Sequence, residues 1–477
     1  MPIPSLLLGP IVGGLSHNRA NIWARATSPS ILHVWLATHA DLSDVQLIGQ
    51  VELPAGDGCA GIVRLERLEP ETRYYYAVSL YPTFPGPQEL HSFTTFPEPR
   101  TPRSFSFAFG SCYLPPDEHG GETMDELHRR IEPDHLRFGL FLGDQIYADG
   151  AERNGLGRIA VTLEEYRAVY EYAWSRPAMR GLLPNLPLFM TLDDHEVDDD
   201  WFWRDPERRW AEIPVHNQIL RWFKGLPPEQ RHLSLERVRA ALRAYYEHQA
   251  MHAPEMLLPL ETDVAGEFQF HRHDTGSLAY KIYFGGAAFF ILDTRTMRVK
   301  GGKKSLLSEG QWTILQEWLK EVNDQYPIKF LVSSGTILYP FWLDVTRDRW
   351  NGFPAERERL LEFLAVNEIE GVHIITGDLH TAHAISAELK CPSGRRIPVW
   401  EFCSSPFEQS ASPSTITYHP LSSKWIGSQK RLFWQTGQNF GVVHVDFDSS
   451  TPRVTFTLHH NQNGWKTRPP ITNILKI

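Results

Sequence analysis

Six short apolar runs, each ending abruptly in polar residues, constrain the fold of this chain most strongly. Amphipathic stretches such as TMDELHRRI, LEEYRAVYEYAW and EGQWTILQEWLKEV lie between several of them. Continuous apolar strands that alternate with helices are typical of an α/β sheet covered on both faces. Open α/β folds bind ligands at the carboxyl edge of the sheet, where we expect these polar residues to gather. The runs are FSFAFGSC, FGLFLGD, LPLFMTLDD, AAFFILDTR, KFLVSSGT and VHIITGDLH.

The first 98 residues have a different pattern, which predicts a separate all-β unit. ANIWARA, SILHVWLAT, GIVRLERL and TRYYYAVSL alternate apolar with polar residues between Pro, Gly and Asp turns. The stretch from LERLEPETRYYYAV to HSFTTFPEP resembles the end of a fibronectin type III module. A Pro-rich seam, Phe96–Ser104, then separates this unit from residues 99–477. Within these, we interpret residues 201–275 as a partly helical insertion near the site and the end of the chain as a β-hairpin.

The ends of the apolar runs offer a thiol, a phenol, imidazoles and several carboxylates. Asp144 and Tyr147 in GDQIY are three residues apart, so one helical turn after the strand would point both the same way. Asp378 and His380 in GDLH are two apart, so an extended chain would place both on one face. Such a donor set suits two metal ions that share a carboxylate, activate water and neutralise a phosphoryl oxygen. The candidates are Cys112, Asp144, Tyr147, Asp193, Asp194, His195, Asp293, Arg295, Asp378 and His380.

In this order, the motifs GSC, GDQIYAD, LDDHEV, LDTR and GDLH resemble those of the alkaline phosphatase D (PhoD) family, within the calcineurin-like metallophosphoesterase superfamily. The resemblance extends from about Leu8 to the last hairpin. It implies an α/β fold with a metallophosphoesterase-type β-sheet core flanked by helices, behind a fibronectin type III-like domain. It also implies metal-dependent hydrolysis of phosphate monoesters, with diesters as further substrates.

The resemblance also implies roles for eight residues. Cys112, Asp144, Tyr147 and His380 would hold a ferric ion (Fe³⁺), with Asp144 bridging to a second metal. Asp194 and Asp378 would face that second position, which holds calcium (Ca²⁺) in the family. His195 matches the histidine of the superfamily's GNH-E/D motif and would donate a proton to the leaving group. Arg295 is a candidate phosphate contact, and a structural ion pair with Asp293 is its alternative interpretation.

Two departures from the family pattern concern the second metal. Many relatives carry asparagine where this chain has Asp199 and Asp200, which make the local charge more negative. FLVSSGTILYP lacks the histidine that the wider superfamily contributes from a later strand end. An oxygen-rich site favours Ca²⁺, with Mg²⁺ or another divalent ion as an alternative. We expect Asp198, Asp199 and Asp200 to form a solvated turn.

Composition excludes several other classes of protein. The net charge of −10 argues against a nucleic-acid partner, and four scattered cysteines cannot form a disulfide framework. No run of 18 apolar residues occurs, so neither a transmembrane helix nor a membrane partner is expected. The N-terminal LLLGPIVGGL has the pattern of a strand rather than a signal peptide, which favours a cytoplasmic location unless a leader has been removed. The expected partner is a small phosphate ester, and the sequence does not specify an oligomeric state.

Two functions from other classes are open alternatives. A metal-independent cysteine hydrolase would use Cys112 as its nucleophile with a histidine base, but it would explain neither Tyr147 nor the carboxylates. A non-catalytic binding protein would use the β-sandwich and the aromatic insertion, and it predicts that the residues at the strand ends do not converge.

Overall fold

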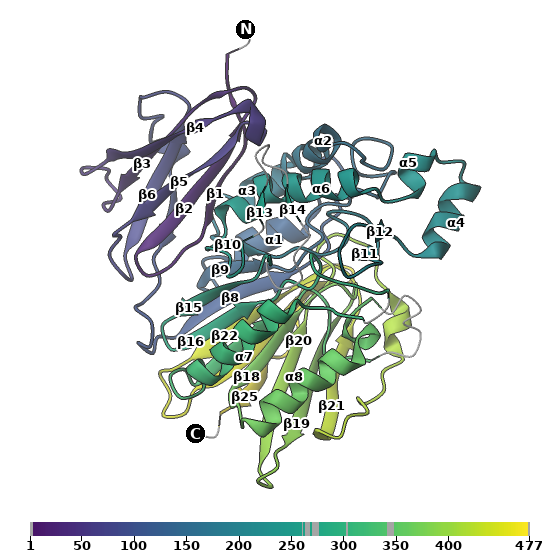
Figure 1. Cartoon of the computed structure of the whole chain (residues 1–477). Helices are drawn as coiled ribbons and strands as arrows, with labels where there is room; N and C mark the ends of the chain where they lie inside the picture. Colours follow the sequence, from purple (N-terminus) through teal and green to yellow (C-terminus); the bar gives the residue numbers. More distant parts are fainter. Residues whose placement is uncertain are drawn as a thin grey trace.

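The computed structural model of the chain describes residues 3–259, 261–262, 268–269, 276–301, 304–340 and 348–475. Its first seven strands form two sheets, with orders β1-β2-β5 and β4-β3-β6-β7, whose buried residues share one core (Figure 1). This confirms the all-β N-terminal unit. The strands are β1 (Leu6–Gly13), β2 (Arg19–Ala26), β3 (Ser30–Ala37), β4 (Gln46–Leu53), β5 (Ala60–Glu66), β6 (Arg73–Ser79) and β7 (His91–Thr94).

The fibronectin type III assignment and the boundary at residue 98 stay predictions. In support of the first, the Glu69 N–H donates a hydrogen bond to the Tyr74 hydroxyl at 2.8 Å, as in the tyrosine corner of such modules. The N-terminal unit packs closely against the rest of the chain, because the Phe96 ring lies 4.7 Å from that of Phe284 and 5.5 Å from that of Phe138, between ring centroids.

Apart from four two-residue strands, the remaining strands form two large sheets with helices on their outer faces, which confirms the predicted α/β fold with a sheet core flanked by helices. The division of the six apolar runs between two sheets was not predicted. In one sheet, the order is β10-β9-β8-β22-β23-β24, and β25 also pairs with β23; in the other it is β15-β16-β17-β18-β20-β19-β21. The first contains β8 (Phe105–Gly110), β9 (Leu136–Phe141), β10 (Leu188–Met190), β22 (Asn439–Asp446), β23 (Arg453–Asn461), β24 (Trp465–Thr467) and β25 (Ile471–Ile474). The second contains β15 (Tyr280–Phe284), β16 (Ala287–Ile291), β17 (Ile328–Val332), β18 (Val372–Thr376), β19 (Ala382–Lys390), β20 (Arg396–Cys403) and β21 (Ile426–Gln435).

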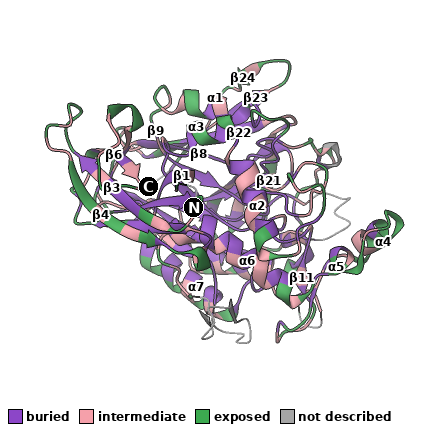
Figure 2. Cartoon of the chain, turned by 90° about the horizontal axis from the view of Figure 1, so that it is seen from above, coloured by how far each residue is buried: buried purple, intermediate pink, exposed green. Residues whose placement is uncertain are grey.

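Aromatic side chains join the two sheets face to face. The ring of Phe107 on β8 lies 5.5 Å from that of Phe289 on β16 and 5.3 Å from that of Phe330 on β17, between centroids. Each sheet therefore has the other on its inner face and helices on its outer face. The buried strands occupy the centre of the molecule in Figure 2. This layering explains why β8, β10, β16, β17 and β18 are buried along their whole length.

Helices cover the outer faces, and the three amphipathic stretches named in the sequence form α1 (Thr123–Arg130), α2 (Leu163–Trp174) and α7 (Glu309–Asn323), as predicted. α1, α2, α3 (Pro177–Leu182) and α6 (Leu235–His248) pack in the core of the first sheet. α7 and α8 (Pro354–Val366) cover the second sheet and cross its front in Figure 1. A Thr162–Glu165 capping box starts α2, and Ser308 caps the start of α7.

The segment 201–275 contains three helices, and residues 260, 263–267 and 270–275 lie outside the described part. α4 (Val215–Phe223) and α5 (Pro228–Arg231) project at the edge of the molecule, whereas α6 is buried against α2 (Figure 1). The remaining short elements are β11 (Phe202–Trp203), β12 (Ala211–Glu212), β13 (Glu261–Thr262), β14 (Phe268–Gln269), η1 (Ala55–Asp57), η2 (Pro87–Glu89), η3 (Ala250–His252), η4 (Trp350–Gly352) and η5 (Pro413–Ile416).

Strand direction places the polar run ends together. β8, β9 and β10 are parallel to one another, as are β16, β17, β18 and β20. Parallel strands end at one edge of their sheet, so the loops that follow them meet there. The predicted C-terminal hairpin is confirmed as β22 and β23, and β22 pairs with β8. Among the described residues, no helix is both long and apolar enough to cross a membrane.

Candidate metal centre

Three loops bring a thiol, a carboxylate and an imidazole into one cluster. Ligand atoms of Cys112 after β8, Asp144 after β9 and His380 after β18 all lie within 4.8 Å of one another. The Sγ atom of Cys112 is 3.3 Å from Asp144 Oδ2, and the Tyr147 hydroxyl is 3.2 Å from His380 Nε2. The structure thus brings together the four side chains that the family resemblance assigned to the ferric ion.

Residues in the left-handed backbone conformation, rather than helices or strands, orient these side chains. Asp144 and Tyr147 lie in a loop without a helical turn, and Asp378 and His380 have φ values of 67° and 51°. The predictions of a helical turn in GDQIY and an extended chain in GDLH were therefore wrong. Cys112 and Asp144 also have positive φ, of 65° and 55°. Such conformations are strained for residues other than glycine and often occur at functional sites.

Two glycines permit the close approach of these loops. A Cβ atom on Gly143 would lie 2.3 Å from Asp193 Cβ, and the glycine has a φ of 91°. A Cβ atom on Gly377 would lie 2.4 Å from the hydroxyl oxygen of Ser111. Side chains at either position would force the loops after β8, β9, β10 and β18 apart.

A second group of carboxylates lies directly beside the first and shares Asp144 with it. Asp144, Asp193 and Asp378 form one candidate ligand group, and Asp144, Asp194 and His195 form another. Burial, followed by the neighbouring Cys112 and Asp194, raises the pKa of Asp144 well above its usual value. Burial also raises the pKa of Asp193 to about 8, despite the opposing effect of Arg295. Buried acids that repel one another in this way are suited to a cation.

The donor atoms fit metal ions. Asp193 Oδ2 and Asp194 Oδ1 are buried and accept no hydrogen bond from the described residues, although Asp194 Oδ1 lies 3.4 Å from Nη2 of Arg295. Burial lowers the pKa of His380 to about 3, so its imidazole is neutral, as metal binding requires. Burial raises the pKa of the Cys112 thiol to about 12. A cation would stabilise the thiolate that burial alone disfavours. The first cluster offers sulfur, nitrogen and oxygen, whereas the second is rich in oxygen.

His195 lies between these clusters and a third carboxylate. Its Nδ1 atom is 2.8 Å from Oδ1 of Asp149, and its ring lies over Tyr147 with 4.1 Å between centroids. Burial disfavours the imidazolium, but Asp149, Asp194 and Asp144 outweigh it and raise the pKa of His195 well above 6.5. The neighbouring carboxylates thus favour the protonated imidazole, the form that a proton donor needs.

The expectation that Asp198, Asp199 and Asp200 form a solvated turn was wrong. Asp198 is fully buried and forms ion pairs with Arg221 of α4 and Arg237 of α6. The Asp200 N–H donates to Asp194 Oδ2 at 2.7 Å, and Asp200 is buried. The Asp199 side chain is 39% exposed, and its Oδ2 accepts a 2.7 Å hydrogen bond from Asn217. Asp194, Asp199 and Asp200 also lie close enough to hold a cation.

Arg295 is buried among carboxylates other than Asp293. It pairs with Asp193, with Asp194 at 3.4 Å and with Asp348 at 2.7 Å, and it is 1% exposed. The Asp293 carboxylate instead accepts backbone N–H groups of Leu278, Arg295 and Thr296. Phosphate binding by Arg295 stays a prediction that this geometry does not favour, because its guanidinium is already paired.

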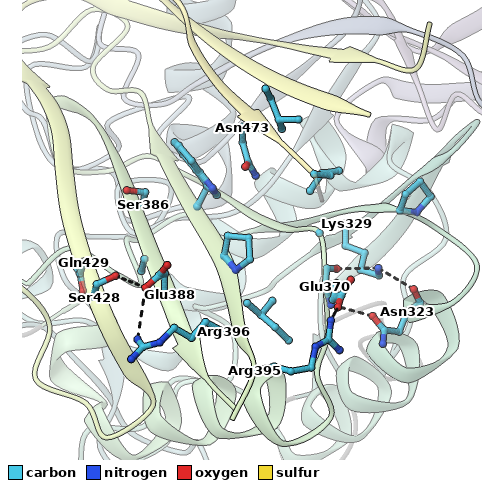
Figure 3. Close-up of a pocket in the computed structure, with 18 of the residues that line it drawn as sticks. Asn323, Lys329, Glu370, Ser386, Glu388, Arg395, Arg396, Ser428, Gln429 and Asn473 are labelled. Atoms are coloured by element: carbon cyan, nitrogen blue, oxygen red, sulfur yellow. Dashed lines mark hydrogen bonds and ion pairs between the residues drawn. The ribbon is translucent and has the colours of Figure 1, made fainter. Parts of the chain in front are cut away.

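A large cavity lies elsewhere, at the amino ends of the second sheet (Figure 3). It has a volume of about 880 Å³ and is lined by residues such as Lys329, Arg396 and Trp400, but by none of the clustered acids. The Lys329 ammonium donates to the carbonyls of Asn323, the last residue of α7, and Glu370, at 3.1 and 2.9 Å. Because this amine caps a helix C-terminus, its burial has a structural explanation.

The sequence and its relatives identify the family. The model of the PhoD-like phosphatase family matches residues 107–456, most of the chain. The chain belongs to the PhoD-like phosphatase family. All eight residues with roles implied by the resemblance lie inside the matched segment. They also converge, from the carboxyl ends of parallel strands in both large sheets, so the prediction that defined a non-catalytic binding protein is wrong.

Comparisons with individual proteins agree with the PhoD-like assignment. Alkaline phosphatase D of Bacillus subtilis (strain 168) is 26% identical over 355 residues, covering 68% of this chain and 53% of that protein. The chain therefore spans about half the length of this relative. The solved structure of PhoD has a TM-score of 0.72 at 18% identity and covers 98% of this chain and 90% of that one. Purple acid phosphatase PPD1 from yellow lupin (Lupinus luteus) seeds has a TM-score of 0.60 at 13% identity, covering 98% and 74%. These similarities confirm the fold.

Sequence reasoning missed several residues of this PhoD-like centre. Asp149 is part of the quoted GDQIYAD motif, but nothing in its spacing indicated that it faces His195. Asp193 was among the strand-end candidates, although only Asp194 was assigned to a metal. Arg349 donates to Asp378 Oδ1 at 3.0 Å from a segment that carried no motif. Ser111 and Ser405 contact the Cys112 sulfur at 3.2 and 3.3 Å.

Proposed function

We propose that this chain is a metal-dependent phosphoesterase that hydrolyses phosphate monoesters, with diesters as further substrates. The convergence of Cys112, Asp144, Tyr147 and His380 beside a second group of carboxylates carries the proposal. Membership of the PhoD-like phosphatase family supports it. A small phosphate ester is the proposed substrate, and a cytoplasmic location stays a prediction.

We assign each metal to the donors that suit it. Cys112, Asp144, Tyr147 and His380 would hold Fe³⁺, because thiolate and phenolate are strong ligands for it. Asp144, Asp194 and Asp378 would hold Ca²⁺ or Mg²⁺, since both ions prefer oxygen ligands. Asp193 is an additional candidate at this second position. When bound, the metals supply an activated water nucleophile and Lewis-acid stabilisation of the phosphoryl group.

The chain's own residues provide orientation and the proton. His195 would protonate the leaving-group oxygen from Nε2, because Nδ1 is held by Asp149. Arg295 would position Asp193 and Asp194 rather than contact phosphate, since it is buried between them and Asp348. Arg349 would hold Asp378 in the same way.

A cysteine hydrolase is less well supported by this geometry. Cysteine nucleophiles act as thiolates and need a low pKa or an adjacent base. Burial raises the pKa of Cys112 to about 12 and lowers that of His380 to about 3. Neither group therefore suits the metal-free nucleophilic mechanism.

Metal removal and reconstitution test the proposed function. Protein purified without chelators would be analysed for metal content and assayed on mono- and diesters from neutral to alkaline pH. We expect bound iron and a second divalent metal, an alkaline optimum, loss of activity on chelation and recovery on reconstitution. Full activity in protein shown to be metal-free would refute the proposal. Alkylation of Cys112 that abolishes activity under chelation would instead support a cysteine hydrolase.

A further inference from the structure

Helix α4 exposes an unusual amount of apolar side-chain surface. Large apolar side chains on the helix and just before it are between 49 and 74% exposed, and α4 projects from the edge of the molecule (Figure 2). Isolated exposed apolar residues are common, but a contiguous group usually marks an interaction surface. We call this group the α4 apolar surface: Trp210, Val215, Ile219, Leu220, Trp222 and Phe223.

The polar face of α4 is turned toward the protein. Asn217 and Arg221 lie one turn apart on the same face and contact Asp199 and Asp198, respectively. Val215, Ile219 and Trp222 follow one another at spacings of four and three residues, about half a turn away from that face. The helix is therefore anchored by its polar face and turns its apolar face outward. A helix that packs on its own core would have the reverse arrangement.

Exposed cations outnumber exposed acids around this surface. Among residues 204–229 the exposed charged residues are Arg204, Arg209, Lys224 and Glu229, although Asp and Glu outnumber Lys and Arg by 57 to 47 in the whole chain. Lys224 and His216 on the helix ends are exposed, as is Arg209 beside Trp210. Exposed tryptophan, phenylalanine and leucine next to cations are typical of helices that lie in the interface of an anionic membrane.

We propose that α4 docks the protein on the surface of anionic lipid bilayers, with Trp222 and Phe223 inserted among the head groups and Lys224 facing lipid phosphates. Nothing in this arrangement crosses the membrane. The inference does not depend on metal binding or hydrolysis, because it uses only the outward face of α4.

The same features disfavour a symmetric dimer through α4. In a two-fold interface each surface packs on its own copy, so the surface that carries Lys224 and Arg209 would face a copy with the same two cations. Like charges across an interface oppose association, whereas an anionic bilayer complements them. Self-association is therefore the outcome that the test must distinguish.

Vesicle binding tests this proposal. The 477-residue chain would be sedimented with vesicles of phosphatidylglycerol and phosphatidylcholine in equal amounts, and with vesicles of phosphatidylcholine alone. We expect binding to the anionic vesicles that weakens as salt rises. The double variant Trp222→Ser, Phe223→Ser should bind at least tenfold more weakly, and Lys224→Glu at least about fivefold more weakly. Ile31→Ser, Ile48→Ser provides the matched control, because both residues are exposed in the N-terminal sandwich; it should bind like the parent protein.

Melting temperatures and sedimentation velocity complete the test. The Trp222→Ser, Phe223→Ser variant should melt at the parent temperature, since both side chains are exposed and contribute little to the core. Absence of parent binding to anionic vesicles, or equal binding to both kinds of vesicle, would overturn the proposal. A parent dimer that the double variant loses, without vesicle binding, would assign the α4 apolar surface to self-association instead.

Discussion

The Nδ1 atom of His195 lies 2.8 Å from Oδ1 of Asp149, and this contact leaves Nε2 as the ring nitrogen that Asp149 does not engage. Asp149 is itself held from behind, because its Oδ2 accepts the Asp199 N–H at 3.1 Å and lies 3.8 Å from Nη2 of Arg221. The orientation of the His195 imidazole therefore depends on Asp199 and on Arg221 of α4, neither of which is among the proposed metal ligands.

The first prediction concerns His195 as proton donor. His195→Ala should keep its metals but hydrolyse an ester with a poor leaving group roughly 10²–10⁴-fold more slowly. The loss should be much smaller for p-nitrophenyl phosphate, because p-nitrophenolate departs without protonation. Turnover of both esters and metal content would be measured together. An equal loss on both esters would contradict this role.

Asp149→Asn provides a graded version of the same test. Asp149 raises the pKa of His195, so its removal should lower that pKa. The pH above which His195 loses its proton should therefore fall. We expect the alkaline limb of the profile of kcat/KM for the poor leaving group to move to lower pH. An unchanged limb, with metals retained, would show that another group donates the proton.

The second prediction compares two neighbouring acids that sequence reasoning had grouped together. Asp198→Asn leaves Arg221 and Arg237 without their buried carboxylate, and breaking such a network costs about 3–5 kcal/mol. Asp199→Asn should change the free energy of unfolding by less than about 1 kcal/mol, because its side chain is partly exposed and Asn can still accept from Asn217. Denaturant unfolding of both variants is the measurement. Equal effects would show that the ion pairs of Asp198 contribute little.

Much of the fold could be predicted from local pattern. The six apolar runs form β8, β9, β10, β16, β17 and β18. They were recognisable because a strand that is buried on both faces needs apolar residues at nearly every position. Their division between two sheets could not be predicted, since an apolar strand carries no mark of its neighbours. The partner of β8 on one side is β22, more than 300 residues later in the chain.

Prediction of individual site residues is limited in the same way. Cys112, Asp144 and Asp378 were recognisable because each ends a strand and belongs to a short motif. The burial of Asp198 was not recognisable, because its sequence neighbours are typical of an exposed turn. Its partners Arg221 and Arg237 come from α4 and α6 and lie beside it only in the folded chain. The burial of Asp198 is thus a consequence of tertiary structure.

The third prediction concerns the metal ligands. A phenolate or thiolate bound to Fe³⁺ absorbs visible light, so the proposed holoenzyme should be coloured. Tyr147→Phe and Cys112→Ser should each shift or bleach the band, whereas Asp194→Ala should lose the second metal and keep the band. Absorbance and elemental analysis of the three variants are the measurements. A colourless, fully active enzyme would refute the iron assignment.

The last prediction concerns acid stability. His373 on β18 is buried, and burial lowers its pKa to about 4, against about 6.5 for an unfolded chain. Below pH 6.5 the unfolded state therefore binds a proton that the folded state does not, and stability falls as the pH falls toward 4. His373→Gln removes this proton uptake but also loses packing. We expect it to be less stable than the parent at pH 8, with a gap that narrows by about 2 kcal/mol at pH 5. Phe330→Leu is the control, because the Phe330 ring packs 5.5 Å from that of His373 but does not titrate; its gap to the parent should be the same at both pH values. A constant gap for His373→Gln as well would show that His373 does not resist protonation in the folded protein.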